Sequence, residues 1–276
     1  MSDAPTAAPA SDVAVADHLA KVHGPSELHV VLLALLLPPG SKRALRAWQI
    51  EAGKIAGAEA LCAHATSLSG ASRLPWFELL LARMQAQPLA ARQKLLLAAR
   101  RLMESRGVAR PIDRLHWLTL RRGLGEAVPL VARPEAHPDD VEWLESDVQS
   151  VAGYTAFLSR MVPGDVADAP QGDAWYQAVM ASFPGFAIPP RQPPKAAAMV
   201  ETLERLQTLS WMQRPVVIRT WVQAALAQSR FGRLTDLSAD ALRMTCALLD
   251  SPQPPELARH YVTLAGNGTT RAGAAG

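Results

Sequence analysis

Nearly every periodic stretch of this 276-residue sequence places its apolar residues at the spacing of an α-helix. Runs that alternate apolar and polar residues, as a half-buried strand requires, are nearly absent. Prolines and glycines separate the helical stretches and indicate turns between them. The sequence therefore predicts an all-α fold built from helical hairpins.

One apolar run raises the question of a membrane span. The run LHVVLLALLL covers ten residues, from Leu28 to Leu37, whereas a spanning helix needs about 20. Hydrophobic residues make up 49% of the chain and charged residues 19%, a balance typical of globular proteins. We expect a buried core helix here and no transmembrane segment. The N-terminus has no secretory or transit pattern, which predicts a cytoplasmic location.

Composition divides the chain into five predicted segments. Both ends are rich in small residues and lack periodicity, which predicts flexible tails. Residues 183–195 contain five prolines, which predicts a stiff segment that is either a hinge between two domains or a strap across one. The predicted segments are a tail 1–25, an N-terminal helical domain 26–162, a proline-rich linker 163–195 with one short helix, a C-terminal helical unit 196–264 and a tail 265–276.

A loose internal repeat follows two of the apolar runs. The stretches SRGVARPIDRLHWL (105–118) and SRFGRLTDLSADAL (229–242) each place a glycine, Gly107 or Gly232, between two predicted helices. The pattern predicts two helix–turn–helix units. Any helical hairpin needs such a turn, so coincidence explains the pattern equally well.

Four stretches around these turns carry a resemblance to a known family. They are ELHVVLLALLLPPGSKRALRAWQIEAG, RLPWFELLLARMQAQPLAARQKLLLAARRLMES, LERLQTLSWMQRPVVIRTWVQAAL and LSADALRMTCALLDSPQPPELA. Together they resemble the long cytoplasmic C-terminal region that follows the peptidase domain in some bacterial HtpX-type membrane zinc metallopeptidases. The resemblance covers residues 26–125 and 200–258.

The resemblance implies two degenerate TerB-like helix-turn-helix units and an accessory role. In the family an aspartate precedes the turn glycine, whereas Arg106 and Phe231 stand at those positions here. Neither side chain ligates a hard cation, so the turns do not predict a metal site. The peptidase motif His-Glu-x-x-His is absent from the sequence. The resemblance therefore implies a stand-alone accessory protein that partners a separate membrane peptidase.

Local motifs for chemistry are also missing. The sequence contains no G-x-S-x-G elbow, no Walker loop and no G-x-G-x-x-G. Cys62 and Cys246 form no CxxC pair, and we expect two buried thiols, with a disulfide between them as the alternative. We predict no catalytic residue, no cofactor and no metal ligand.

Charge is unevenly distributed along the chain, although the net charge is only +3. The segment 92–122 holds nine Lys or Arg and two acids, and 135–147 holds six acids. The basic segment is interpreted as a solvated face, as a surface that docks on acids of this chain or of a partner, or as a nucleic-acid surface. The candidate partner-binding residues are Arg100, Arg101, Arg110, Arg114, Arg121 and Arg122.

These observations predict a non-catalytic protein-interaction or accessory protein, with a membrane metallopeptidase as a candidate partner. One alternative is a nucleic-acid-binding protein that uses the basic segment 92–122. The low net charge and the nearby acidic block count against an extended phosphate-binding surface. Another alternative is an enzyme whose site is assembled in space without a local motif.

Overall fold

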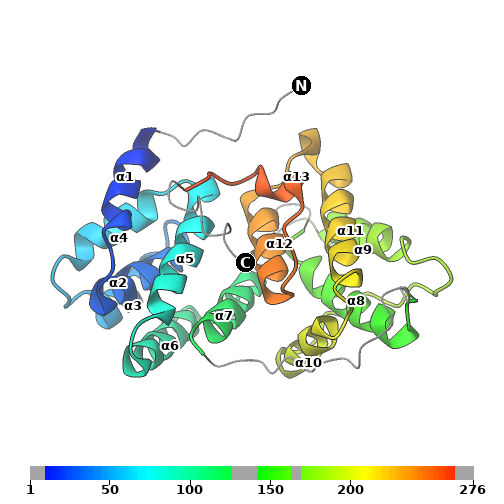
Figure 1. The fold of residues 1–276 in the computed structure, drawn as a ribbon, viewed down its shortest axis with the longest axis horizontal. Helices are drawn as coiled ribbons and strands as arrows, with labels where there is room; N and C mark the ends of the chain where they lie inside the picture. The colour runs from blue at the N-terminus through cyan, green and yellow to red at the C-terminus, as the bar shows by residue number, and fades with distance from the viewer. Residues whose placement is uncertain (1–9, 126–141, 163–168, 265–276) are drawn as a thin grey trace, which may run out of the picture. The chain divides into compact units, whose positions relative to one another are not determined.

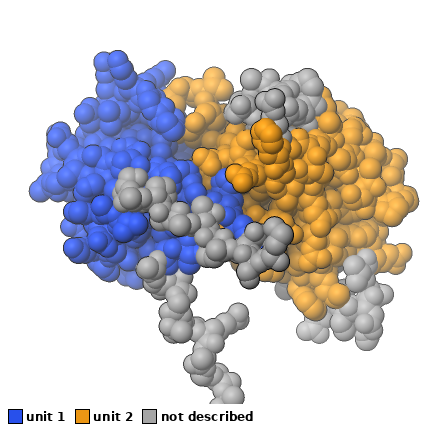
Figure 2. Space-filling view, turned by 90° about the horizontal axis from the view of Figure 1, so that it is seen from above, with its two compact units in different colours: residues 1–105, 259–276 blue, residues 106–258 orange. Residues whose placement is uncertain are grey.

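The computed structural model describes residues 10–125, 142–162 and 169–264, and the secondary structure within these ranges is entirely helical (Figure 1). This confirms the all-α prediction. Contacts divide the chain into two compact units, which Figure 2 colours separately. Unit 1 comprises residues 1–105 and 259–276, and unit 2 comprises residues 106–258.

Unit 1 is built around one buried helix, α2. All residues of α2 from Leu28 to Leu35 are buried, and α3, α4, α5 and α6 pack around it. The predicted core helix is therefore confirmed. The helices of this unit are α1 (Ala10–Ala20), α2 (Pro25–Leu35), α3 (Lys42–Ala52), α4 (Ala58–Ser67), α5 (Gly70–Gln85) and α6 (Leu89–Glu104).

The C-terminal end of α2 is held by one side chain, Arg73 of α5. Arg73 of α5 donates from Nε to the carbonyl of Leu35 at 3.0 Å and from Nη2 to the carbonyls of Ala34 and Leu37. These carbonyls lie at the helix C-terminus, where the last turn has no intrahelical donors. The charged cap lets an almost wholly apolar helix end inside the unit.

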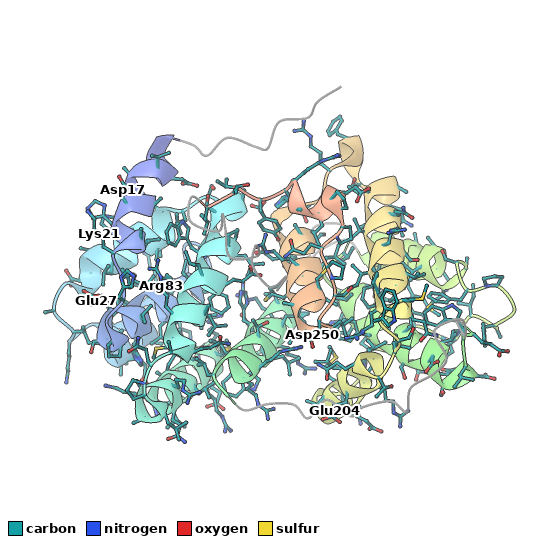
Figure 3. The ribbon with its side chains drawn as sticks, viewed as in Figure 1. Asp17, Lys21, Glu27, Arg83, Glu204 and Asp250 are labelled. Atoms are coloured by element: carbon teal, nitrogen blue, oxygen red, sulfur yellow. The ribbon has the colours of Figure 1, made fainter. Side chains whose placement is uncertain are left out.

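The prediction of a flexible tail over residues 1–25 is wrong for α1, which is a helix from Ala10 to Ala20. This helix packs on α4, and α5 holds both of its ends. At its start Asp12 accepts hydrogen bonds from the backbone N–H of Ser69 at 3.3 Å and from the hydroxyls of Ser69 and Ser72 at 2.5 Å each. At its end Arg83, labelled in Figure 3, donates to the carbonyls of Leu19, Ala20 and Val22.

We expect Asp12→Ala to destabilise unit 1 and release α1. Asp12 is 3% exposed and Ser72 is 1% exposed, so the substitution leaves a buried hydroxyl without its acceptor and costs about 1–3 kcal/mol. Chemical unfolding followed by circular dichroism measures the loss, and limited proteolysis detects cleavage in α1. Asp17→Ala is the control, because Asp17 is exposed on the same helix (Figure 3); an equal loss in both variants would contradict the anchoring role.

His29 is a buried titratable group in the core of unit 1. It lies on α2 with 3% exposure, and its Nε2 has no hydrogen-bond partner among the residues that the structure describes. Burial and the positive charges of Lys94 and Arg101 lower its pKa below 6.5, against opposing contributions from the backbone and carboxylate of Glu51. The folded protein therefore favours the neutral imidazole.

Acidification is expected to weaken unit 1 through His29. Because its folded pKa is lowered, the unfolded chain takes up the proton first as the pH falls through about 6.5, and the free energy of unfolding then decreases until the folded pKa is passed. Unfolding measured at about pH 7.5 and pH 5.5 tests this expectation. His29→Leu should reduce the difference between the two pH values, whereas His23→Leu, at an exposed histidine, should not. An unchanged difference in His29→Leu would contradict the assignment.

Unit 2 has an aromatic core. Trp221 on α11 is fully buried, stacks on Tyr154 with ring centroids 5.6 Å apart, and donates from Nε1 to Thr155 Oγ1 at 2.9 Å. Trp175 on α9 donates from Nε1 to the backbone carbonyl of Trp221 at 3.2 Å. The helices of this unit are α7 (Pro111–Gly123), α8 (Glu145–Leu158), α9 (Ala169–Met180), α10 (Ala196–Gln207), α11 (Gln213–Gln228), η1 (Arg230–Gly232), α12 (Asp236–Leu248) and α13 (Pro255–Ala258).

The two glycine turns have similar backbone conformations, but the helices that flank them pack differently. Gly107 and Gly232 both adopt a left-handed conformation, with φ of 88° and 62°, as a turn after a helix requires. The division between the units falls at the first turn, between Ser105 and Arg106. Helices α11 and α12 pack together inside unit 2, and α7 also packs on α12. The two repeats are therefore not equivalent hairpins.

The proline-rich segment lies inside unit 2. The predicted domain 26–162 ended before this segment, whereas the contacts group α7 and α8 with α9 to α12. The predicted short helix within 163–195 corresponds to α9. The hydroxyl of Tyr176 donates to the carbonyl of Pro189 at 2.8 Å, and Arg191 forms an ion pair with Asp173. The segment is therefore a strap across one unit and not a hinge between two domains.

Candidate functional site

The first two predicted arginines lie on α6 in unit 1. Arg100 forms an exposed ion pair with Glu104 one turn away, at 2.8 Å. Arg101 makes two hydrogen bonds of 2.7 Å to the carboxylate of Glu51 on α3. This bidentate contact is the first cause of the lowered pKa of Glu51. Both guanidinium groups are thus engaged by carboxylates of the same unit.

Arg110, whose side chain is 46% exposed, pairs with a buried carboxylate in unit 2. It precedes α7 and donates from Nη2 to Asp113 Oδ1 at 2.8 Å, and Arg106 donates from Nη1 to the same oxygen at 2.8 Å. Asp113 is 4% exposed. Burial alone would raise its pKa, but the hydrogen bonds from Arg110 and the charge of Arg106 outweigh burial and lower it. The carboxylate therefore stays ionised and fixes the first turn of α7.

The other three predicted arginines lie along α7. Arg122 forms an ion pair with Asp250, labelled in Figure 3, and also donates to the carbonyl of Leu248. Arg114 and Arg121 are half-buried. Arg100, Arg101, Arg110 and Arg122 therefore each have an acidic partner within their own unit. The predicted pairing of this segment with the acidic block 135–147 falls largely outside the described residues, since 126–141 are not among them.

An exposed apolar cluster lies where α10 is followed by α11. Trp211 is 70% exposed, Met212 38% and Val216 45%. Met212 and Val216 are four residues apart at the start of α11, so their side chains are neighbours on one face. We call Trp211, Met212 and Val216 the Trp211 cluster. The other tryptophans are buried or half-buried, which makes Trp211 the exception among seven.

The corner that carries the Trp211 cluster is held by reciprocal hydrogen bonds. The backbone N–H of Gln213 donates to Ser210 Oγ at 3.1 Å, and the backbone N–H of Ser210 donates to Gln213 Oε1 at 3.0 Å. This arrangement is that of a capping box. Gln213 is 1% exposed, and its Nε2 donates to the carbonyl of Glu142 at 3.2 Å. The apolar side chains therefore project from a fixed backbone.

A pocket of about 530 Å³ lies in unit 1, lined by parts of α3, α4 and the loop before α3. Trp48 and Leu45 form part of its apolar wall, with Lys42 also in the lining. Cys62 contributes a thiol whose pKa is raised by burial, so it is mostly protonated and a poor nucleophile at neutral pH. Both Cys62 and Cys246 are buried thiols, as predicted.

The described ranges contain neither a metal-ligand group nor a membrane-spanning helix. Among residues 10–125, 142–162 and 169–264, no three His, Cys, Asp or Glu side chains are grouped so that they could hold a metal ion. No helix in this part of the chain combines the length and apolar character needed to cross a bilayer.

Comparisons with known proteins returned no match. Neither the family models, nor the curated proteins, nor the solved structures contain one that matches this sequence or fold.

Proposed function

We propose that this chain is a non-catalytic protein-interaction protein and that the Trp211 cluster is its principal contact surface. The observation that carries the proposal is a 70% exposed tryptophan, followed closely in the sequence by two more exposed apolar side chains, Met212 and Val216. Soluble proteins rarely expose large apolar groups together unless the surface is used. Tryptophan is also enriched among the residues that dominate the energy of protein interfaces.

The rigid corner favours binding. Because the capping hydrogen bonds between Ser210 and Gln213 already fix the backbone, little backbone entropy is lost when a partner covers Trp211. The surrounding helices are packed in unit 2. A partner with an apolar pocket would gain the burial of an indole ring at small conformational cost.

The resemblance to the C-terminal region of HtpX-type peptidases supplies a candidate partner. We propose a cytoplasmic accessory protein that binds a separate membrane zinc metallopeptidase, with TerB-like units as its scaffold. The four sequence stretches quoted above support this proposal. The peptidase is one candidate for the protein partner. Capture of a different protein would contradict the peptidase as partner but would still support the Trp211 cluster as the contact surface.

The ion pairs of the basic segment count against nucleic-acid binding. Arg101, Arg110 and Arg122 each engage a carboxylate of the chain. A nucleic acid would have to break these ion pairs before its phosphates could contact the arginines. The cost of breaking them offsets part of the binding free energy that counterion release provides. The net charge of +3 provides little additional attraction.

Quantitative affinity capture tests the proposal. The tagged chain and a Trp211→Ser variant are cross-linked in the source cells, and the captured proteins are compared by mass spectrometry. We expect one protein in stoichiometric amount with the unchanged chain and a loss in the variant, because truncating a central interface tryptophan costs about 2 kcal/mol or more, roughly 30-fold in Kd.

The matched control is Leu97→Ser. Leu97 is 57% exposed on α6 of unit 1 and should not affect capture. Equal capture by all three chains, or recovery of nucleic acid that is lost at higher salt, would contradict the proposal. Circular dichroism of each variant verifies that the helical fold is intact.

A further inference from the structure

The proline-rich strap of unit 2 has a backbone suited to recognition as a polyproline II helix. Its sequence from 187 to 195 is AIPPRQPPK, and these residues form neither helix nor strand. Each proline fixes its own φ near −65° and restricts the preceding residue to extended geometry. Lys195, the last residue of the strap, has φ −64° and ψ 165°, close to polyproline II values.

One face of the strap is attached to unit 2. A polyproline II helix has three residues per turn, so Arg191 and Pro194 share a face, and both are half-buried. Arg191 forms an ion pair with Asp173 on α9 and donates from Nη1 to Ser159 Oγ at 3.0 Å. The hydroxyl of Tyr176 holds the carbonyl of Pro189 at 2.8 Å.

A different face is open. Pro190 and Pro193 are both exposed and lie one polyproline turn apart. Gln192 and Lys195 are also exposed. The spacing Pro-x-x-Pro-x-Lys places a cation at a fixed distance beyond two prolines. Among the described residues, Arg191 and the carbonyl of Pro189 attach the strap to unit 2, whereas Pro190 and Pro193 are exposed.

We propose that the strap is a preformed ligand for a protein domain with a polyproline-binding groove. The groove would be lined by aromatic side chains that receive Pro190 and Pro193, as in SH3-type recognition of Pro-x-x-Pro segments. An acidic side chain at one end of the groove would pair with Lys195. Because Arg191 and Tyr176 already hold the strap in place, the partner meets a segment with little conformational entropy left to lose.

This surface differs from the Trp211 cluster and its test is independent of the proposed function. The probe is a purified SH3 domain selective for Pro-x-x-Pro-x-Lys ligands, titrated into the full-length chain by calorimetry. We expect saturable binding that is tighter than binding of a synthetic peptide with the sequence of residues 186–197. Pro190→Ala and Pro193→Ala should each weaken binding by about tenfold or more, and Lys195→Glu should abolish it.

Pro184→Ala is the matched control, because Pro184 is an exposed proline of the same segment outside the motif; its affinity should equal that of the unchanged chain. Binding of the peptide without binding of the full chain would overturn the proposal, since the strap would then be inaccessible. Absence of binding to both would also overturn it, as would binding that survives Pro190→Ala and Pro193→Ala together.

Discussion

Replacing Asp113 with alanine is expected to cost about 3–5 kcal/mol of the free energy of unfolding, because removing one partner of a buried ion pair leaves the opposite charge uncompensated. Asp113 accepts hydrogen bonds from Arg106 and Arg110, and the side chain of Arg106 is only 8% exposed. The carboxylate also accepts from the backbone N–H of Arg110 at 3.1 Å, at the start of α7. Chemical unfolding of the full-length chain, followed by circular dichroism, measures the loss.

The matched control is Glu104→Ala, which removes an exposed ion pair with Arg100 and should cost about 0–1 kcal/mol. The pH dependence of unfolding provides a second test of the contribution of Asp113 to stability. Because the folded pKa of Asp113 is lowered, its contribution is present above the unfolded pKa of about 3.9 and is lost as the pH falls through the folded value. Similar losses in Asp113→Ala and Glu104→Ala would show that the cluster does not stabilise unit 2.

The second large effect is expected for Trp221→Ala, with a loss of about 3–5 kcal/mol. Trp221 is fully buried, stacks on Tyr154 and donates to Thr155 Oγ1. The substitution removes a large ring from the centre of unit 2, and the surrounding helices cannot fill the space without moving. Near-ultraviolet circular dichroism and chemical unfolding report the loss of packing and of stability.

Trp221→Phe separates packing from hydrogen bonding. The phenyl ring preserves most of the apolar contact with Tyr154 but removes the Nε1 donor to Thr155. We expect a smaller loss of about 1–3 kcal/mol. Trp211→Ala serves as the exposed control and should change stability by about 0.5 kcal/mol or less. A loss in Trp221→Ala no larger than that of this control would contradict the core assignment.

The helical class was predictable because the signal is local. The run Leu28–Leu35 is apolar except for His29, and the structure buries every one of these residues in α2, as expected of a helix surrounded by others. Glycines at 107 and 232 marked turns, and both adopt left-handed backbone conformations. Such features depend on residues within one or two helical turns, which a single sequence contains.

Helix α1 was missed because its anchors lie elsewhere in the chain. Asp12 caps the start of α5 through Ser69 and Ser72, which follow it by 57 and 60 residues. A short alanine-rich stretch is only a marginal helix by itself, so its stability comes from these distant contacts. The grouping of α7 with α12 is another long-range property that local patterns do not indicate.

The candidate site was predicted from the Lys and Arg residues of one segment, because the sequence does not show which carboxylates pair with them in the fold. Glu51 and Asp250 engage Arg101 and Arg122 from distant parts of the sequence, so a local excess of positive charge did not imply an unneutralised surface. The Trp211 cluster was missed because a tryptophan in the sequence does not by itself indicate exposure, and the other six are buried or half-buried. The reciprocal pattern of Ser210 and Gln213 was the available signal that the chain turns at this point and projects Trp211 outward.

Site-specific photocrosslinking tests directly whether the Trp211 cluster contacts a partner protein. The photoreactive amino acid benzoylphenylalanine is placed at position 216 within the Trp211 cluster, or at position 97 on α6 as the control, and the source cells are irradiated. We expect one discrete protein adduct from position 216, its loss on adding Trp211→Ser, and no adduct from position 97. The absence of an adduct at 216, or the same adducts from both positions, would contradict the assignment of the Trp211 cluster as a protein-binding surface.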